Sequence, residues 1–274
     1  MTKITELTNQ LGEILLPRGY KKAGKLFYRV QGDGVVVFFC FEYDPGDRGH
    51  QLCFGIDSLY NSELKTPKEL NLNPTFCLLT KQELQEYSFN NWCSITPPSN
   101  ELLQSIVAND SSVFYKCLYK GAEEQNQKRN AREFDILREN DFLDRIDKLH
   151  DFTQVEAFMI EMAERDGIWH ETDRQRFFYA YLSVGRYTDA VWAFRSIEKQ
   201  NYWALYENSK YFESYDFESK RKECETYLTP RRRFVLLLEA NKTEEVQKCL
   251  QEIYAHNLAT FGVRKKRSKR VSKE

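Results

Sequence analysis

The alternation of hydrophobic and polar positions over the first sixty residues predicts one helix followed by three strands. Helical spacing separates Ile4, Leu7, Leu11, Ile14 and Leu15. This spacing indicates an amphipathic helix over residues 2–16, which Pro17 and Gly19 end. Three strand-like segments follow in order: KLFYRVQ (Lys25 to Gln31), the almost wholly apolar VVVFFCFEY, and QLCFGIDSL. Gly32-Asp33-Gly34 supplies a tight reversal, so the pattern predicts an antiparallel meander with the helix over one face.

The pattern weakens from residue 60 to about residue 98 and then becomes helical. TFCLLT and NWCSIT are expected to add further strands. The stretch GAEEQNQKRNARE is charged and poor in apolar residues, which is typical of a solvated helix or a linker. We therefore predict an α+β fold with an α+β domain over residues 1–120. A helical domain of antiparallel hairpins over 121–263 and a basic tail over 264–274 complete the predicted organisation.

Small residues in FYAYLSVGRYTDAVWAFRSIEK predict a helical hairpin. A glycine turn lets two amphipathic helices reverse, and alanines allow close approach. Leu182, Gly185, Tyr187 and Ala190 give a layout that resembles tetratricopeptide repeats. One unit matches and no 34-residue period recurs, so helical hairpins are expected rather than a tandem array. Further along, Pro230 is expected in the first turn of the helix RRRFVLLLEA.

Composition favours a folded cytoplasmic protein. The 274 residues are 41% hydrophobic, enough for one large or two modest domains. No apolar run approaches the roughly 20 residues of a membrane helix, and Glu6 and Glu13 are unlike a signal peptide. The chain has seven cysteines, an odd number, and no two of them are separated by the two residues of a zinc or redox motif. They are therefore expected to be reduced thiols.

Charge is concentrated at the C-terminus. The chain has a formal net charge of −1, whereas its last eleven residues, with seven bases and one acid, carry +6, which leaves −7 for the rest. Such a tail suits nucleic-acid phosphates, and the residues that would contact them are Arg264, Lys265, Lys266, Arg267, Lys269 and Arg270. The same residues could instead solubilise the terminus or fold back onto the acidic body.

A second basic cluster, which we call the basic lip, precedes the first strands and consists of Lys21, Lys22, Lys25 and Arg29. It suits a phosphate or an acidic partner. The favoured interpretation is a solvated turn whose lysines discourage edge-to-edge strand pairing.

The motif around the basic lip also resembles a known family. Its letters are G-Y-K-K-x-G-x-x-F-x-R, carried by Gly19, Tyr20, Lys21, Lys22, Gly24, Phe27 and Arg29. With the preceding helix and the later FGIDS stretch, this resembles the bacterial domain-of-unknown-function family numbered 4304. The resemblance covers at most the first 120 residues. It implies an α+β fold and no established activity.

Sequence motifs nominate no catalytic residue, metal ligand or cofactor. Neither a nucleophile elbow nor a phosphate-binding loop is present. The four histidines lack metal-ligand spacing, and the His150-Asp151 dipeptide has no partner histidines. Of the histidines, His170 lies in the most suggestive setting, but a helix start suffices to explain its acidic neighbours Glu171 and Asp173. The enzyme alternative would use His170 or a buried cysteine.

Aromatic residues crowd the stretch YWALYENSKYFESYDF, and such residues are enriched at protein interfaces. The predicted partner-binding residues are Tyr202, Trp203, Tyr206, Tyr211, Phe212 and Tyr215. The alternative is that they fill a helical core. We therefore predict a non-enzymatic protein that binds a protein partner, with no membrane contact and no fixed expectation of oligomeric state. A bacterial immunity or defence accessory is one version suggested by analogy. Two alternatives stay open: nucleic-acid binding through the tail, and an enzyme with a site between the two halves.

Overall fold

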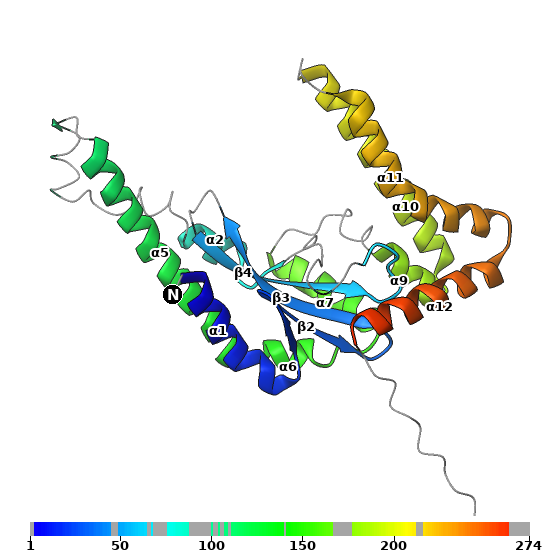
Figure 1. Cartoon of the computed structure of the whole chain (residues 1–274), viewed down its shortest axis with the longest axis horizontal. Helices are drawn as coiled ribbons and strands as arrows, with labels where there is room; N and C mark the ends of the chain where they lie inside the picture. Colours follow the sequence, from blue (N-terminus) through cyan, green and yellow to red (C-terminus); the bar gives the residue numbers. More distant parts are fainter. Residues whose placement is uncertain are drawn as a thin grey trace, which may run out of the picture.

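The computed structural model describes residues 3–44, 49–64, 67, 76–87, 100, 104, 107–108, 111–139, 141–166, 177–211 and 216–262. These residues form a five-stranded antiparallel sheet and a series of helices (Figure 1). The strands are β1 (Lys21–Ala23), β2 (Leu26–Gln31), β3 (Val35–Asp44), β4 (Gly49–Ser58) and β5 (Phe76–Cys77). The helices are α1 (Lys3–Leu15), the 3-10 turn η1 (Leu16–Arg18), α2 (Lys81–Glu86), α5 (Ser111–Glu139), α6 (Phe142–Ile146), α7 (Phe152–Asp166), α9 (Phe178–Ser183), α10 (Tyr187–Tyr211), α11 (Phe217–Glu239) and α12 (Thr243–Thr260). The predicted α+β class, with an N-terminal antiparallel sheet, a covering helix and a helical remainder, is confirmed.

The meander follows from its turns and its central strand. Gly32 and Gly34 adopt positive φ angles of 43° and 97° in the β2–β3 reversal, a conformation that only glycine enters at little cost. β3 then pairs along its whole length with β4, from Val35 opposite Ser58 to Asp44 opposite Gly49. Because side chains of β3 are buried on both faces of the sheet, its near-continuous apolar sequence is that of a central strand.

Helices cover both faces of the sheet. On one face, residues of α1, α5, α6 and α7 share a core with the strands. This core includes Leu11, Phe39, Phe54, Phe134, Leu143 and Phe158. On the other face, Phe261, just after α12, packs with Tyr28, Val36 and Phe38. The sheet is therefore the middle layer of the molecule.

The charged stretch that was expected to be a solvated helix or a linker lies inside α5. This helix runs unbroken across the predicted boundary at residues 120 and 121. One of its faces is buried although it is polar, and it comprises Gln125, Asn126, Arg129, Asn130 and Glu133. The carboxylate of Glu133 accepts a hydrogen bond from Leu52 N (3.1 Å), and Asn130 Nδ2 donates to His50 O (2.8 Å). On this edge, β4 pairs with β5 at Cys53 and Phe54. Glu133 and Asn130 therefore take the place of a neighbouring strand for Leu52 N and His50 O.

The helical hairpin predicted around Gly185 is confirmed, whereas the predicted helix start at Pro230 is wrong. Gly185 has a φ of +76° between α9 and α10, and Ala190 is fully buried. Pro230 instead lies inside α11, which begins at Phe217, where Asp216 accepts a hydrogen bond from Ser219 N (3.1 Å). The strand expected in TFCLLT is limited to Phe76–Cys77. The NWCSIT stretch lies outside the described residues.

Candidate functional site

Helices α10 and α11 form an antiparallel pair that projects from the sheet (Figure 1), and we call this pair the arm. A seam of buried side chains joins its two helices. The seam consists of Ala190, Ala193, Phe194, Ile197 and Leu205 from α10, with Cys224, Leu228, Phe234 and Val235 from α11. Apolar burial at i, i+3 and i+4 positions explains why these segments are helical and why they pair.

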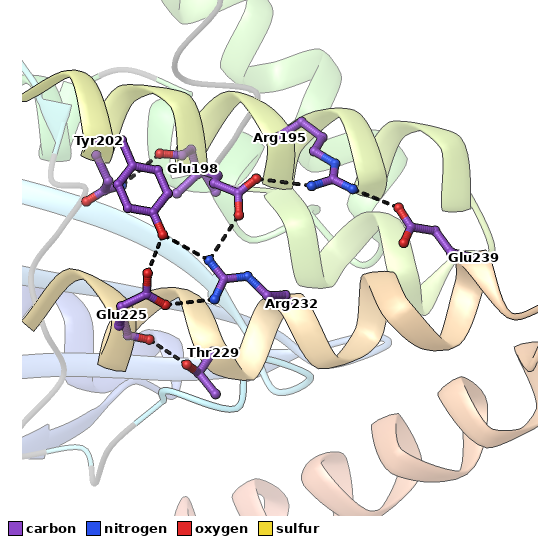
Figure 2. A network of polar contacts seen from close by, with 9 residues as sticks. Arg195, Glu198, Tyr202, Glu225, Thr229, Arg232 and Glu239 are labelled. Carbon is purple, nitrogen blue, oxygen red and sulfur yellow. Dashed lines mark hydrogen bonds and ion pairs between the residues drawn. The ribbon is translucent and has the colours of Figure 1, made fainter. Parts of the chain in front are cut away.

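A ladder of ion pairs runs beside this seam (Figure 2). Arg232 reaches Glu225 Oε2 at 2.7 Å along its own helix and Glu198 Oε1 at 3.0 Å on the facing helix. Arg195 continues the ladder to Glu198 (3.1 Å) and Glu239 (2.8 Å). Cations and carboxylates thus alternate along the contact, so each carboxylate has a positive neighbour.

Tyr202 belongs to this ladder through its hydroxyl group. The hydroxyl donates to Glu225, and Arg232 donates to Tyr202 Oη at 3.3 Å (Figure 2). Hydrogen bonds from Tyr202 and Arg232 lower the pKa of Glu225, and the same carboxylate raises the pKa of Tyr202. Glu225 is therefore held as an anion, and Tyr202 is fixed in orientation.

The C-terminal half of α10 carries exposed aromatic rings. Trp203, Tyr206 and Tyr211 are 62%, 51% and 75% exposed. The rings of Trp203 and Tyr206 lie 6.0 Å apart, and Lys210 Nζ lies 4.1 Å from the centre of the Tyr206 ring. We call Tyr202, Trp203, Tyr206 and Tyr211 the aromatic face.

The aromatic face contains four of the six residues predicted to bind a partner. Phe212 and Tyr215 lie outside the described residues. On α11, Phe217 and Tyr227 are also exposed. The sequence analysis did not include Tyr227 among the exposed aromatic residues, because it predicted that the helix begins at Pro230. The helix begins thirteen residues earlier, at Phe217. A helical reading from Asp216 would have placed it on the arm.

The basic lip makes contacts within the chain. Arg29 pairs with Asp147 (2.9 Å), and Lys22 lies 5.5 Å above the ring of Phe27. Lys21 Nζ donates to Gly262 O (3.1 Å) just beyond α12. Lys21 and Lys22 lie exposed on the edge strand β1, an arrangement that suits the favoured interpretation as protection against edge pairing. The six predicted tail residues lie outside the described residues.

Polar side chains fill the junction between β4 and the helices beyond it. Arg231, buried in α11, donates to Glu63 and to Tyr227 O (3.0 Å). Asn257 Nδ2 donates to Leu59 O (2.8 Å) and to Asn61 O (2.9 Å). These hydrogen bonds bind α11 and α12 to the segment that follows β4.

Asp57, near the end of β4, is a carboxylate at this junction with a raised pKa. Burial raises its pKa to about 6, against 3.8 for an ordinary aspartate. Such a value suits general acid–base chemistry. However, its oxygens accept hydrogen bonds from Ser58 N (2.6 Å) and from Asn61 Nδ2 (3.1 Å), which gives the carboxylate a structural role.

Other chemical features are sparse in the described part of the chain. A small hollow of about 10 Å³ lies beside Glu156, Tyr181 and Arg186, which is room for about one water molecule. Within those residues, no group of three metal-ligating side chains gathers. The four described cysteines Cys40, Cys53, Cys224 and Cys249 form no disulfide bond, and burial raises the pKa of Cys40 to about 12. His170 lies outside the described residues.

Among the described helices, none is long and apolar enough to span a membrane.

Comparison with known proteins finds no matching family model, no matching curated protein and no matching solved structure.

Proposed function

We propose that the protein is a binding protein that holds a protein partner on the aromatic face of the arm. The observation that carries this proposal is the exposure of Trp203, Tyr206 and Tyr211 on one projecting helix. Exposed aromatic rings are costly to leave in water and are the side chains that contribute most to protein interfaces.

The framework of the arm supports this role. The Arg232 ladder fixes the separation of the two helices, and Tyr202 is held by its hydroxyl group. The rings are therefore presented on a rigid helix, which reduces the entropy lost on binding.

Charge favours a protein partner over a nucleic acid at this surface. From Lys199 to Tyr227 the sequence has five bases and six acids. A surface close to neutrality has little attraction for phosphates, whereas aromatic rings rimmed by mixed charges are typical of protein interfaces. A role in bacterial defence is a version of this proposal that rests on analogy.

The test compares capture of proteins from a host lysate by three immobilised forms of the full chain. These are the wild type, Trp203→Ala/Tyr206→Ala, and the control Tyr43→Ala. Tyr43 is 59% exposed but lies on β3. We expect the wild type and the control to capture a stoichiometric protein partner. The double variant should capture at least tenfold less of it.

The free energy of unfolding should stay within about 0.5 kcal/mol of the wild type in both variants, because the substituted rings are exposed. Equal capture of the partner by all three forms would show that the aromatic face does not bind it.

A further inference from the structure

We propose that the segment of the partner held by α10 is an amphipathic helix with two acidic residues, which lies along a line of side chains that begins and ends with a lysine. We call this line the lysine–aromatic stripe, and it consists of Lys199, Trp203, Tyr206 and Lys210. The inference rests on the proposed function, because it names the chemistry of the partner that the aromatic face holds.

The four residues of the stripe lie on one face of α10. Their successive separations in the chain are four, three and four residues, which are the spacings that bring side chains next to one another along a helix. Lys199 and Lys210 are therefore about 16 Å apart along the helix axis, with the two rings between them. All four side chains are exposed.

Contacts within the stripe join its aromatic centre to its positive end. The rings of Trp203 and Tyr206 lie 6.0 Å apart with an angle of 50° between their planes. Lys210 Nζ lies 4.1 Å from the centre of the Tyr206 ring. The stripe thus offers apolar surface at its centre and positive charge at both ends.

The carboxylates next to the stripe leave most of this charge available. Glu198 belongs to the ladder and pairs with Arg232 at 3.0 Å (Figure 2). Lys199, the next residue, forms no ion pair within the described part of the chain. Lys210 pairs with Glu207 at 3.4 Å, a long and exposed contact that a carboxylate of a partner can replace. The stripe is therefore positively charged although the arm as a whole is close to neutral.

A second copy of the chain does not complement the stripe. The order of side chains along it is lysine, ring, ring, lysine, and this order is the same in both directions. Two copies laid against each other would set lysine against lysine whether the helices ran parallel or antiparallel, and like charges across an interface oppose association. The complementary partner is a different chain, with carboxylates at the same spacing.

The spacing of the charges favours a peptide over a nucleic acid. Each strand of a nucleic acid brings about one phosphate per 3.4 Å, whereas the stripe has cations at its two ends only. In a partner helix, two acids eleven residues apart match the two lysines. Apolar residues four and seven positions after the first acid then meet the rings, as when an amphipathic helix packs on a recognition surface.

The test is a double-mutant cycle on the binding of two fluorescein-labelled peptides to the full chain, measured by anisotropy in about 50 mM KCl. Both peptides are alanine-rich helices of about 18 residues, with two leucines placed to meet the rings. The acidic peptide has glutamates at the two positions that face the lysines, and the neutral peptide has glutamines there. The proteins are the wild type, Lys199→Gln/Lys210→Gln, and the control Lys128→Gln/Lys248→Gln, which removes two exposed lysines on α5 and α12.

We expect the wild type and the control to bind the acidic peptide about fivefold more tightly than the neutral one, because each lysine then faces a carboxylate. Lys199→Gln/Lys210→Gln should bind the two peptides within twofold of each other. This loss of preference assigns the effect to the stripe and not to other cations of the chain.

Three results would overturn the inference and leave the proposed function standing. These are an equal preference for the acidic peptide in the wild type and the lysine variant, no preference in the wild type, and no binding of either peptide. The proposed function is decided separately, by whether Trp203→Ala/Tyr206→Ala loses the partner captured from the lysate.

Two further measurements test the other occupants of the stripe. Tighter binding of a single-stranded RNA of about twelve nucleotides than of the acidic peptide would assign the stripe to nucleic acid. A dimer in sedimentation equilibrium that Trp203→Ala/Tyr206→Ala abolishes would assign it to a second copy of the chain. Either result would overturn the choice of an acidic helix.

Discussion

At the scale of single residues, Arg231 joins α11 to the segment after β4 through a nearly buried guanidinium. It is 7% exposed, donates to Glu63, and lies 4.0 Å from the centre of the Tyr227 ring. Its hydrogen bond to Tyr227 O falls one turn before Pro230, where a proline inside a helix disturbs the backbone ladder. One guanidinium thus satisfies both a partly buried carboxylate and a helix carbonyl.

We predict that Arg231→Met lowers the free energy of unfolding by about 3 kcal/mol, because a partly buried carboxylate is left without its cation. Urea unfolding at pH 7 measures this. Arg231→Met/Glu63→Gln should recover part of the loss, since the remaining charge is then removed as well. A single variant as stable as the wild type would show that the pair contributes nothing.

Asp57 should give the protein a characteristic dependence of stability on pH. Its pKa is about 6 in the fold and 3.8 as an ordinary aspartate, so between about pH 4 and 6 the native state binds more protons than the unfolded state. Stability due to this group therefore falls as pH rises through that window.

We predict that Asp57→Asn, which cannot ionise, matches the wild type near pH 4 and is more stable than it above pH 6. The urea midpoints of both proteins at pH 4, 5, 6 and 7.5 measure the difference. A constant difference across the four pH values would mean that the pKa of Asp57 is not raised in the fold.

At the scale of the elements, the ion-pair ladder should stabilise the arm more than isolated surface pairs do. Arg232 contacts Glu198, Glu225 and Tyr202, whereas on the same helix the one ion pair of Arg221 within the described residues is with the exposed Glu218. We predict a loss of about 1–2 kcal/mol for Arg232→Met and less than about 0.5 kcal/mol for Arg221→Met. Hydrogen exchange should show lost protection in α10 and α11 and unchanged protection in β3. Equal effects of the two substitutions would remove the special role of the ladder.

Elements whose burial is apolar could be predicted from the sequence, and those whose burial is polar could not. In α1 and β3 the buried residues, such as Leu7, Leu11 and Phe39, are apolar. Their spacing in the sequence therefore indicates a helix and a strand. α5 buries Asn130 and Glu133 because they bond to the β4 backbone, and no hydropathy pattern reveals such a match.

The candidate site divides in the same way. The aromatic face could be predicted, because rings such as Trp203 and Tyr206 are visible as composition. The ladder could not, since it depends on the register between α10 and α11, which sets Glu198 against Arg232. The contact of Lys21 with Gly262 could not be predicted either, because it depends on how the chain after α12 packs against β1.

At the scale of the whole molecule, the sheet joins parts of the chain that the sequence pattern separated. The core on its first face contains residues from Leu7 to Ala180, and these lie on both sides of the predicted boundary. Its second face is closed by Phe261, with Tyr254 and Leu258 packed alongside. Neither side of the predicted boundary at residues 120 and 121 completes these cores alone.

We therefore predict that a fragment of residues 1–120 does not fold, because it loses Phe134, Leu143 and Phe158 from the first face and Phe261 from the second. Exposing such a core removes most of the apolar burial that balances chain entropy. A chain ending at Gly262 is the control, since it keeps every described residue of both faces. Near-ultraviolet circular dichroism and amide dispersion in NMR spectra should be native-like for the control and absent for the fragment. A well-dispersed spectrum from residues 1–120 would instead establish the predicted boundary as a true domain boundary. It would mean that the sheet and α1 form a stable core without the rest of α5.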